Sequence, residues 1–174
     1  LNLPALRPFD ANIYNMAQIT AVGDFPEFTA QQALCLPLQL TLTQALDVDL
    51  KAAVRVYNEL GWEVASADAV FADASQRLSS EAPVGTTLTA YPLLRLPFAA
   101  PAGAYRLEVT VYDERVSPSG YDVLNERGWR ALALGTWTTQ AGADWTQVTR
   151  ASNLPQTAPL VVSDDLTLLA HNAD

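Results

Sequence analysis

The sequence has few of the residues from which nucleophilic and metal sites are usually built. It contains one cysteine, Cys35, and one histidine, His171. A single cysteine cannot form an internal disulfide, and a zinc site is not indicated without Cys and His at ligand spacing. A Ser–His or Cys–His pair would depend on His171, close to the C-terminal end. We therefore predict no catalytic residue and no metal site, and we interpret Cys35, which stands among leucines, as a buried thiol.

Positive charge and long apolar segments are also scarce. Lys51 is the only lysine, the arginines are scattered, and the net charge is −9. Nucleic acids and anionic membrane surfaces are bound by clustered positive charge, so neither is an expected partner. Apolar runs are short, such as Ala131–Leu134, and we expect no direct membrane insertion of this segment. The chain has no P-loop and no dinucleotide fingerprint, so no cofactor is predicted.

The clearest positive signal is a turn at residues 101–104 followed by a strand of strict alternation. Every second position of that strand is apolar or aromatic: Tyr105, Leu107, Val109 and Val111. Such a strand has one face on a core and one in water, which is typical of antiparallel sheets. A tyrosine just after a glycine turn, at the start of a strand, resembles the tyrosine corner of immunoglobulin-like sandwiches.

Similar segments recur along the chain. Five leucines share one strand face at alternate positions: Leu34, Leu36, Leu38, Leu40 and Leu42. Further strands are predicted over residues 13–22, 50–57, 62–67, 86–96, 121–124 and 129–138, with a hairpin loop at Asn58–Gly61. Pro37 predicts an edge position or a bulge, and the Ala-rich residues 68–78 predict a short helix. The pattern favours an all-β, immunoglobulin-like antiparallel β-sandwich of about eight strands.

The same pattern divides the chain into three parts. Residues 1–12 carry two prolines and no clean periodicity, which predicts an N-terminal arm or linker. Residues 13–140 form the sandwich. Residues 141–174 are a C-terminal extension, either an extra hairpin built from Leu160–Val162 and Leu166–Leu169 or the start of a second module.

Aromatic side chains in the last third of the chain are the candidate ligand-binding residues. On period two, Trp129 and Trp137 share one face, opposite Leu132 and Leu134, and are predicted to point outward. Exposed aromatic faces stack on sugar rings, and an interface with a neighbouring domain would use the same residues. The candidate set is Tyr112, Tyr121, Trp129 and Trp137.

Acidic residues leave two further alternatives open. Paired acids occur in several turns, at Asp47 with Asp49, Asp68 with Asp73, and Asp113 with Glu114. None of these spacings matches a calcium loop, although a structural calcium stays an alternative. Glycoside hydrolysis needs only two carboxylates at a suitable separation, and Glu108 is the best single candidate. Aspartate also favours turns for purely local reasons, and glutamate on an outward strand face is usually solvated.

The order of the strand motifs resembles a known family. The matching motifs are Leu38–Leu42, Val54–Tyr57 with Gly61–Ala65, Leu94–Pro97, Pro101–Leu107 with Val111–Asp113, and Leu132–Gly135. In this order they are similar to a β-sandwich domain of bacterial cell-surface proteins, notably in Chloroflexi, where it is appended to dolichyl-phosphate-mannose-type glycosyltransferases. The chain departs from that family at Thr43-Gln44, where an aromatic is usual, and at Ala82–Thr86, where Trp-x-x-Gly-Glu is usual. The resemblance implies an extracytoplasmic or cell-surface location and carries no catalytic residue.

The expected function is therefore that of a non-catalytic extracytoplasmic accessory or interaction module of a larger bacterial surface or membrane protein. Its expected partner is a neighbouring domain or protein, or a glycan. The alternative is a carbohydrate-binding module that uses exposed Trp and Tyr side chains. A β-sandwich glycoside hydrolase is the third hypothesis.

Overall fold

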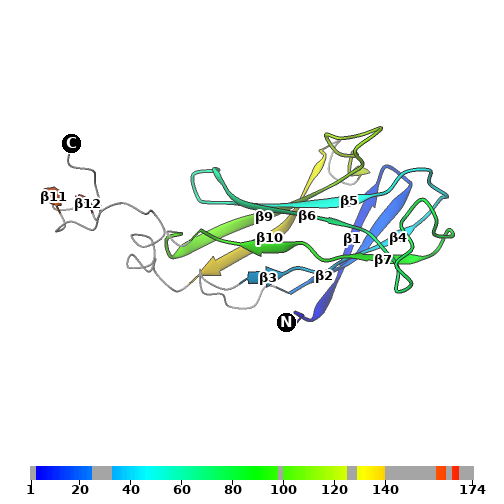
Figure 1. The fold of residues 1–174 in the computed structure, drawn as a ribbon, viewed down its shortest axis with the longest axis horizontal. Helices are drawn as coiled ribbons and strands as arrows, with labels where there is room; N and C mark the ends of the chain where they lie inside the picture. The colour runs from blue at the N-terminus through cyan, green and yellow to red at the C-terminus, as the bar shows by residue number, and fades with distance from the viewer. Residues whose placement is uncertain are drawn as a thin grey trace.

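The computed structural model describes residues 3–24, 33–97, 100–124, 129–139, 160–163 and 166–168 (Figure 1). One four-stranded sheet has the order β1-β2-β4-β7: β1 (Leu6–Ile13), β2 (Ala17–Gly23), β4 (Leu38–Leu42) and β7 (Thr87–Ala90). The other has the order β10-β9-β5-β6: β10 (Ala131–Thr139), β9 (Gly103–Tyr112), β5 (Lys51–Tyr57) and β6 (Glu63–Val70). All pairings are antiparallel, and the described residues contain no helix. The antiparallel β-sandwich is confirmed; its immunoglobulin-like character stays a prediction.

The core lies between the two sheets and follows the predicted alternation. The five leucines of residues 34–42 are each at most 4% exposed. From the opposite sheet, the alternate residues of β5 and β9 meet them: Ala52, Val54, Val56, Tyr105, Leu107, Val109 and Val111. One continuous hydrophobic cluster results, because period-two apolar side chains from two facing sheets must fill the same layer.

The N-terminal segment differs from the prediction. From Leu6 onward it is not an arm but the edge strand β1, paired with β2. An irregularity in the register between Pro8 and Ala11 breaks the alternation, so the strand has no periodic signal in the sequence. The predicted strand over 13–22 is likewise interrupted, because Tyr14 and Asn15 adopt positive φ angles of 48° and 59° in the turn between β1 and β2.

Two other segments also differ. The helix predicted over residues 68–78 is absent: β6 runs to Val70, and a turn follows. The Ala-rich composition is explained by small side chains on β6, where Ala65, Ala67 and Ala69 pack against the core. The strand predicted over 86–96 is two short strands, β7 and β8 (Leu93–Arg95), separated by Tyr91-Pro92.

A separate two-stranded sheet extends one end of the sandwich. Its strands are β3 (Ala33–Cys35) and β8, and Cys35 pairs with Leu93. Cys35 is a buried free thiol, as predicted, and burial raises its pKa. Pro37 lies between β3 and β4, where its carbonyl accepts the Gly23 amide at 2.7 Å. Because Pro37 lies at this break between strands, its lack of an N–H removes no hydrogen bond from either strand ladder.

The most consequential difference is a β-bulge in β10. Ala133 pairs with Glu108 and Gly135 with the next residue along β9, Leu107, so Leu134 has no partner of its own. An extra residue reverses which face the following side chains occupy. Trp137, predicted to point outward, is therefore buried at 1% exposure.

Residues 160–168 contain the predicted hairpin strands. β11 (Leu160–Ser163) pairs antiparallel with β12 (Leu166–Leu168). The predicted turn residues 164–165 and most of the extension, residues 140–159, lie outside the described residues. Both interpretations of the extension, an extra hairpin and the start of a second module, stay predictions.

Candidate functional site

The four aromatic residues singled out from the sequence do not form a common surface. Trp137 belongs to the core, and Trp129 is 68% exposed just before β10 begins. Tyr112 is half-buried at the end of β9, where it pairs with Lys51. Tyr121 is half-buried, and its ring centroid is 6.2 Å from that of Tyr14. No planar row of exposed aromatics is formed by this set.

Tyr121 has a structural partner in Asp113, which is 1% exposed. The Tyr121 hydroxyl donates to Asp113 Oδ2 at 2.5 Å. The backbone amides of Arg115, Val116 and Ser117 donate to the same carboxylate at 2.8, 2.7 and 3.0 Å. Burial by itself raises the Asp113 pKa, but these donors outweigh it and hold the pKa below the usual value. Burial and the Asp113 carboxylate together raise the pKa of Tyr121. The pair closes the turn after β9.

Other acids named from the sequence also have local partners. Asp49 accepts the Ser80 hydroxyl at 2.6 Å, and Glu114 pairs with Lys51 at 2.5 Å. Glu108, the candidate acid for hydrolysis, pairs with Arg106 Nε at 2.9 Å. Within the described ranges, no three His, Cys, Asp or Glu side chains are grouped so that they could hold a metal ion.

A different surface combines a regular array of polar side chains with a groove. The solvent side of β2, β4 and β7 carries the uncharged side chains Gln18, Gln39, Thr41, Thr87 and Thr89, with Ala21 beside Gln39; we call the five polar positions the polar face. The strand register aligns them in two rows, Gln18–Thr41–Thr87 and Gln39–Thr89. In the first row the hydroxyl oxygens of Thr41 and Thr87 are 3.3 Å apart. The rows form a regular array of amide and hydroxyl groups.

A groove of about 610 Å³ opens at the β7 edge of the polar face. Its floor includes Gln39, Thr87 and Thr89, and Tyr91, 51% exposed, lines it just after β7. The segment after β6 forms the opposite wall, from Ala72 to Gln76. A volume of this size lies within the range of about 300–1,000 Å³ typical of small-molecule sites. We call this cavity the edge groove.

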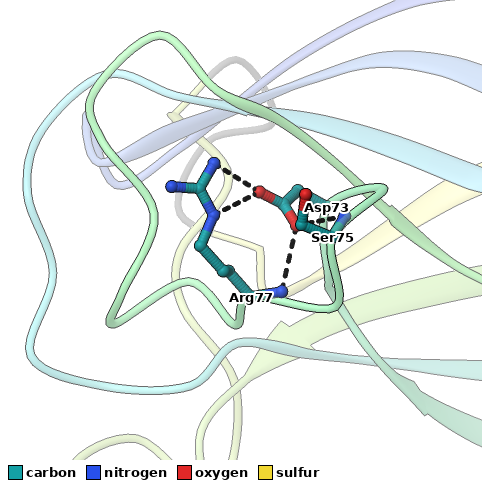
Figure 2. Close-up of polar contacts among 3 residues, drawn as sticks. All are labelled: Asp73, Ser75 and Arg77. Atoms are coloured by element: carbon teal, nitrogen blue, oxygen red, sulfur yellow. Dashed lines mark hydrogen bonds and ion pairs between the residues drawn. The ribbon is translucent and has the colours of Figure 1, made fainter.

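The far wall of the edge groove is held by Asp73 and Arg77 (Figure 2). The backbone amides of Ser75 and Arg77 donate to Asp73 Oδ1 at 2.8 and 3.0 Å. The Arg77 guanidinium donates a hydrogen bond from Nε to Oδ2 at 2.7 Å, and its Nη2 forms an ion pair with the same oxygen at 2.7 Å. The Arg77 amide and guanidinium and the Ser75 amide lower the Asp73 pKa against the opposing effect of burial. The carboxylate is therefore neutralised within its own turn.

This turn sets the position of Gln76 and closes the sheet edge. The Gln76 amide donates to the Asp73 carbonyl at 3.0 Å, and Gln76 adopts a positive φ of 66°. Before the turn, Ala72 exchanges backbone hydrogen bonds with Thr89, at 2.8 and 3.3 Å. Both backbone groups of Thr89 are thus occupied, and β7 offers no free ladder positions at that point.

Sequence reasoning missed this site, although two signals for it were present. The alternating Gln and Thr positions opposite the leucines indicate a solvated sheet face without charge. The spacing of Asp73 and Arg77 is that of a closed turn, because an aspartate often accepts amides two to four residues later. The position of Tyr91 beside the groove depends on the strand break at Pro92, which periodicity does not predict.

Comparison with protein-family models, with curated proteins and with solved structures found no match to this chain. The resemblance to the Chloroflexi surface domains thus stays a prediction. In the part of the chain that the structure describes, no helix has the length and hydropathy needed to cross a membrane.

Proposed function

We propose that this chain is a non-catalytic accessory module of a larger bacterial surface or membrane protein, located outside the cytoplasm. The module contacts a target through the polar face and its edge groove. The observation that carries the proposal is the array of neutral amide and hydroxyl groups in register across three strands, beside a groove of about 610 Å³. The order of strand motifs supports the surface location.

The partners of the acids favour binding over hydrolysis. A retaining or inverting glycosidase needs one carboxylic acid and one carboxylate that both face the substrate. Asp73, in the edge groove, already accepts three hydrogen bonds and one ion pair from its own turn. Asp113, which lines a second cavity of about 400 Å³, accepts four hydrogen bonds. The pKa values of both carboxyl groups are lowered, so these residues fit a structural role better than the role of a proton donor.

A sedimentation experiment tests this proposal and does not require the target molecule to be identified. The purified chain is mixed with washed bacterial cell envelopes and sedimented, and the bound fraction is measured. We expect saturable association that falls when Thr87→Arg places a charge on the polar face. The matched control is Thr138→Arg, the same change at an exposed position of β10 on the other sheet, which should bind like the unmodified chain.

Two kinds of result would contradict the proposal. The first is a failed envelope assay, with either no association at all or association that Thr87→Arg and Thr138→Arg reduce equally. The other is enzymatic turnover of chromogenic glycosides by the purified chain. Circular dichroism of both variants checks that each retains the fold.

A further inference from the structure

We propose that the edge groove binds an uncharged glycan chain, with Tyr91 as the stacking platform and Gln39, Gln76 and Thr89 as hydrogen-bonding groups. This inference rests on the proposed accessory function and gives it a ligand class. It also moves the glycan site away from Trp129 and Trp137, the tryptophans indicated by the sequence.

The first argument is the chemistry of the lining. Gln39, Gln76, Thr87 and Thr89 each carry a side chain that both donates and accepts hydrogen bonds. Sugar hydroxyls also donate and accept, so such groups match a polyol without requiring a fixed charge. The one ionised group of the lining, Asp73, is neutralised by Arg77 within its own turn.

The second argument is the aromatic residue. Tyr91 lines the groove and is 51% exposed, although it follows directly on β7. A tyrosine ring offers an apolar face and a polar tip, which suits a ligand with apolar C–H faces and hydroxyl edges. Trp129, by contrast, is exposed but lines none of the described cavities.

The third argument separates a glycan from an extended peptide. A peptide that adds to a sheet uses the free amide and carbonyl groups of an edge strand. At Thr89, which lines the edge groove, these groups are already taken, because Ala72 is bonded to both its amide and its carbonyl. Recognition here depends on side chains, which favours a ligand rich in hydroxyl groups over a β-strand.

Charge selects among glycans. The chain carries a net charge of −9, and none of the residues that line the groove is positively charged. An acidic polysaccharide would be repelled without compensation. The groove therefore fits neutral chains, and binding should depend only weakly on salt.

The test is a titration of the ¹⁵N-labelled chain followed by NMR, with affinities from calorimetry. Neutral cello-, manno- and galacto-oligosaccharides form one arm, and polygalacturonate oligomers and hyaluronan form the other. We expect one neutral series to bind saturably and to shift the side-chain amides of Gln39 and Gln76. Tyr91→Ala should weaken binding by about tenfold or more, and Trp129→Ala should leave it unchanged. Thr89→Val, which removes a hydroxyl at equal volume, serves as a second groove variant.

The outcomes separate this inference from the function on which it rests. Binding that Trp129→Ala abolishes and Tyr91→Ala spares would overturn the site. Binding of acidic oligosaccharides alone would overturn the ligand class. If no glycan binds but Thr87→Arg still reduces association with envelopes, the glycan inference fails while the accessory function stands. If association with envelopes is also absent, both fail.

Discussion

The Tyr105 hydroxyl donates a hydrogen bond of 2.6 Å to the carbonyl of Pro101, and the Thr139 hydroxyl reaches the same carbonyl at 3.3 Å. One carbonyl oxygen therefore joins the turn before β9 to the start of β9 and the end of β10. The phenol is the closer donor, and the Tyr105 side chain is 2% exposed. The Tyr105 hydroxyl therefore ties the start of β9 to the turn that precedes it.

Tyr105→Phe keeps the buried ring and removes only this donor. We expect the free energy of unfolding to fall by about 1 kcal/mol, the usual net value of one hydrogen bond. Urea denaturation measures it. Thr139→Val should cost less because its bond is longer. The double variant should lose more than the sum, since either hydroxyl alone still satisfies the carbonyl. Unchanged stability of Tyr105→Phe would show that this hydrogen bond contributes nothing.

Trp137 and Trp129 should respond very differently to truncation. Trp137→Ala empties a core site that is 1% exposed and should cost about 3–5 kcal/mol of unfolding free energy. Trp129→Ala changes a side chain that is 68% exposed and should lie within about 0.5 kcal/mol of the unmodified chain. Thermal and chemical denaturation compare the two. Equal costs would contradict the face reversal at the β10 bulge.

Stability should fall in acid through Asp113 and Asp73. The pKa of each carboxyl is lowered in the folded state, so the folded chain holds the ionised form more strongly than the unfolded chain does. The stabilisation is fully present above the unfolded pKa of about 3.9 and is lost as pH falls through the lower folded pKa. We expect stability to be constant near neutrality and to decrease below about pH 4.

Asp113→Asn isolates one of the two contributions. At neutral pH it should cost roughly 1.5–3 kcal/mol, because hydrogen bonds to a charged acceptor are lost. The difference from the unmodified chain should shrink as the pH falls further below the unfolded pKa. Tyr121→Phe removes one donor and should raise the Asp113 pKa, which NMR of the carboxyl carbon reports. A difference that grows in acid would contradict the assigned sign.

Much of the fold follows from the sequence because period-two burial leaves a direct trace. The leucines of residues 34–42 and the alternation of β9 each predict the buried face correctly. The hairpin at Asn58–Gly61 is equally evident, and Gly61 in that loop has a positive φ of 78°. In these segments local pattern and tertiary burial coincide.

The errors arise where the strand register is irregular or where distant segments meet. Leu132 and Leu134 are buried, at 4% and 3% exposure, so strict alternation counted from them places Trp137 outward. The bulge in β10 adds a residue and reverses the faces that follow it, which buries Trp137. The irregular register near Pro8 conceals β1 in the same way. The edge groove joins β4, β7 and the turn at Asp73, and such a meeting of distant segments leaves no periodic signal.

Gly120 and Gly61 form a matched pair that distinguishes backbone strain from steric exclusion. Both have positive φ angles, 99° and 78°. A β-carbon at Gly61 would meet nothing within 4 Å, whereas one at Gly120 would collide with Thr110 Cγ2.

Gly61→Ala should cost about 1–2 kcal/mol from strain alone. Gly120→Ala adds overpacking and should cost about 2–4 kcal/mol in total. Adding Thr110→Ser, which removes the obstructing methyl, should recover part of the excess at Gly120 and nothing at Gly61. If the two glycine variants unfold at the same urea concentration, the segment before Tyr121 does not pack against β9 as closely as this geometry requires.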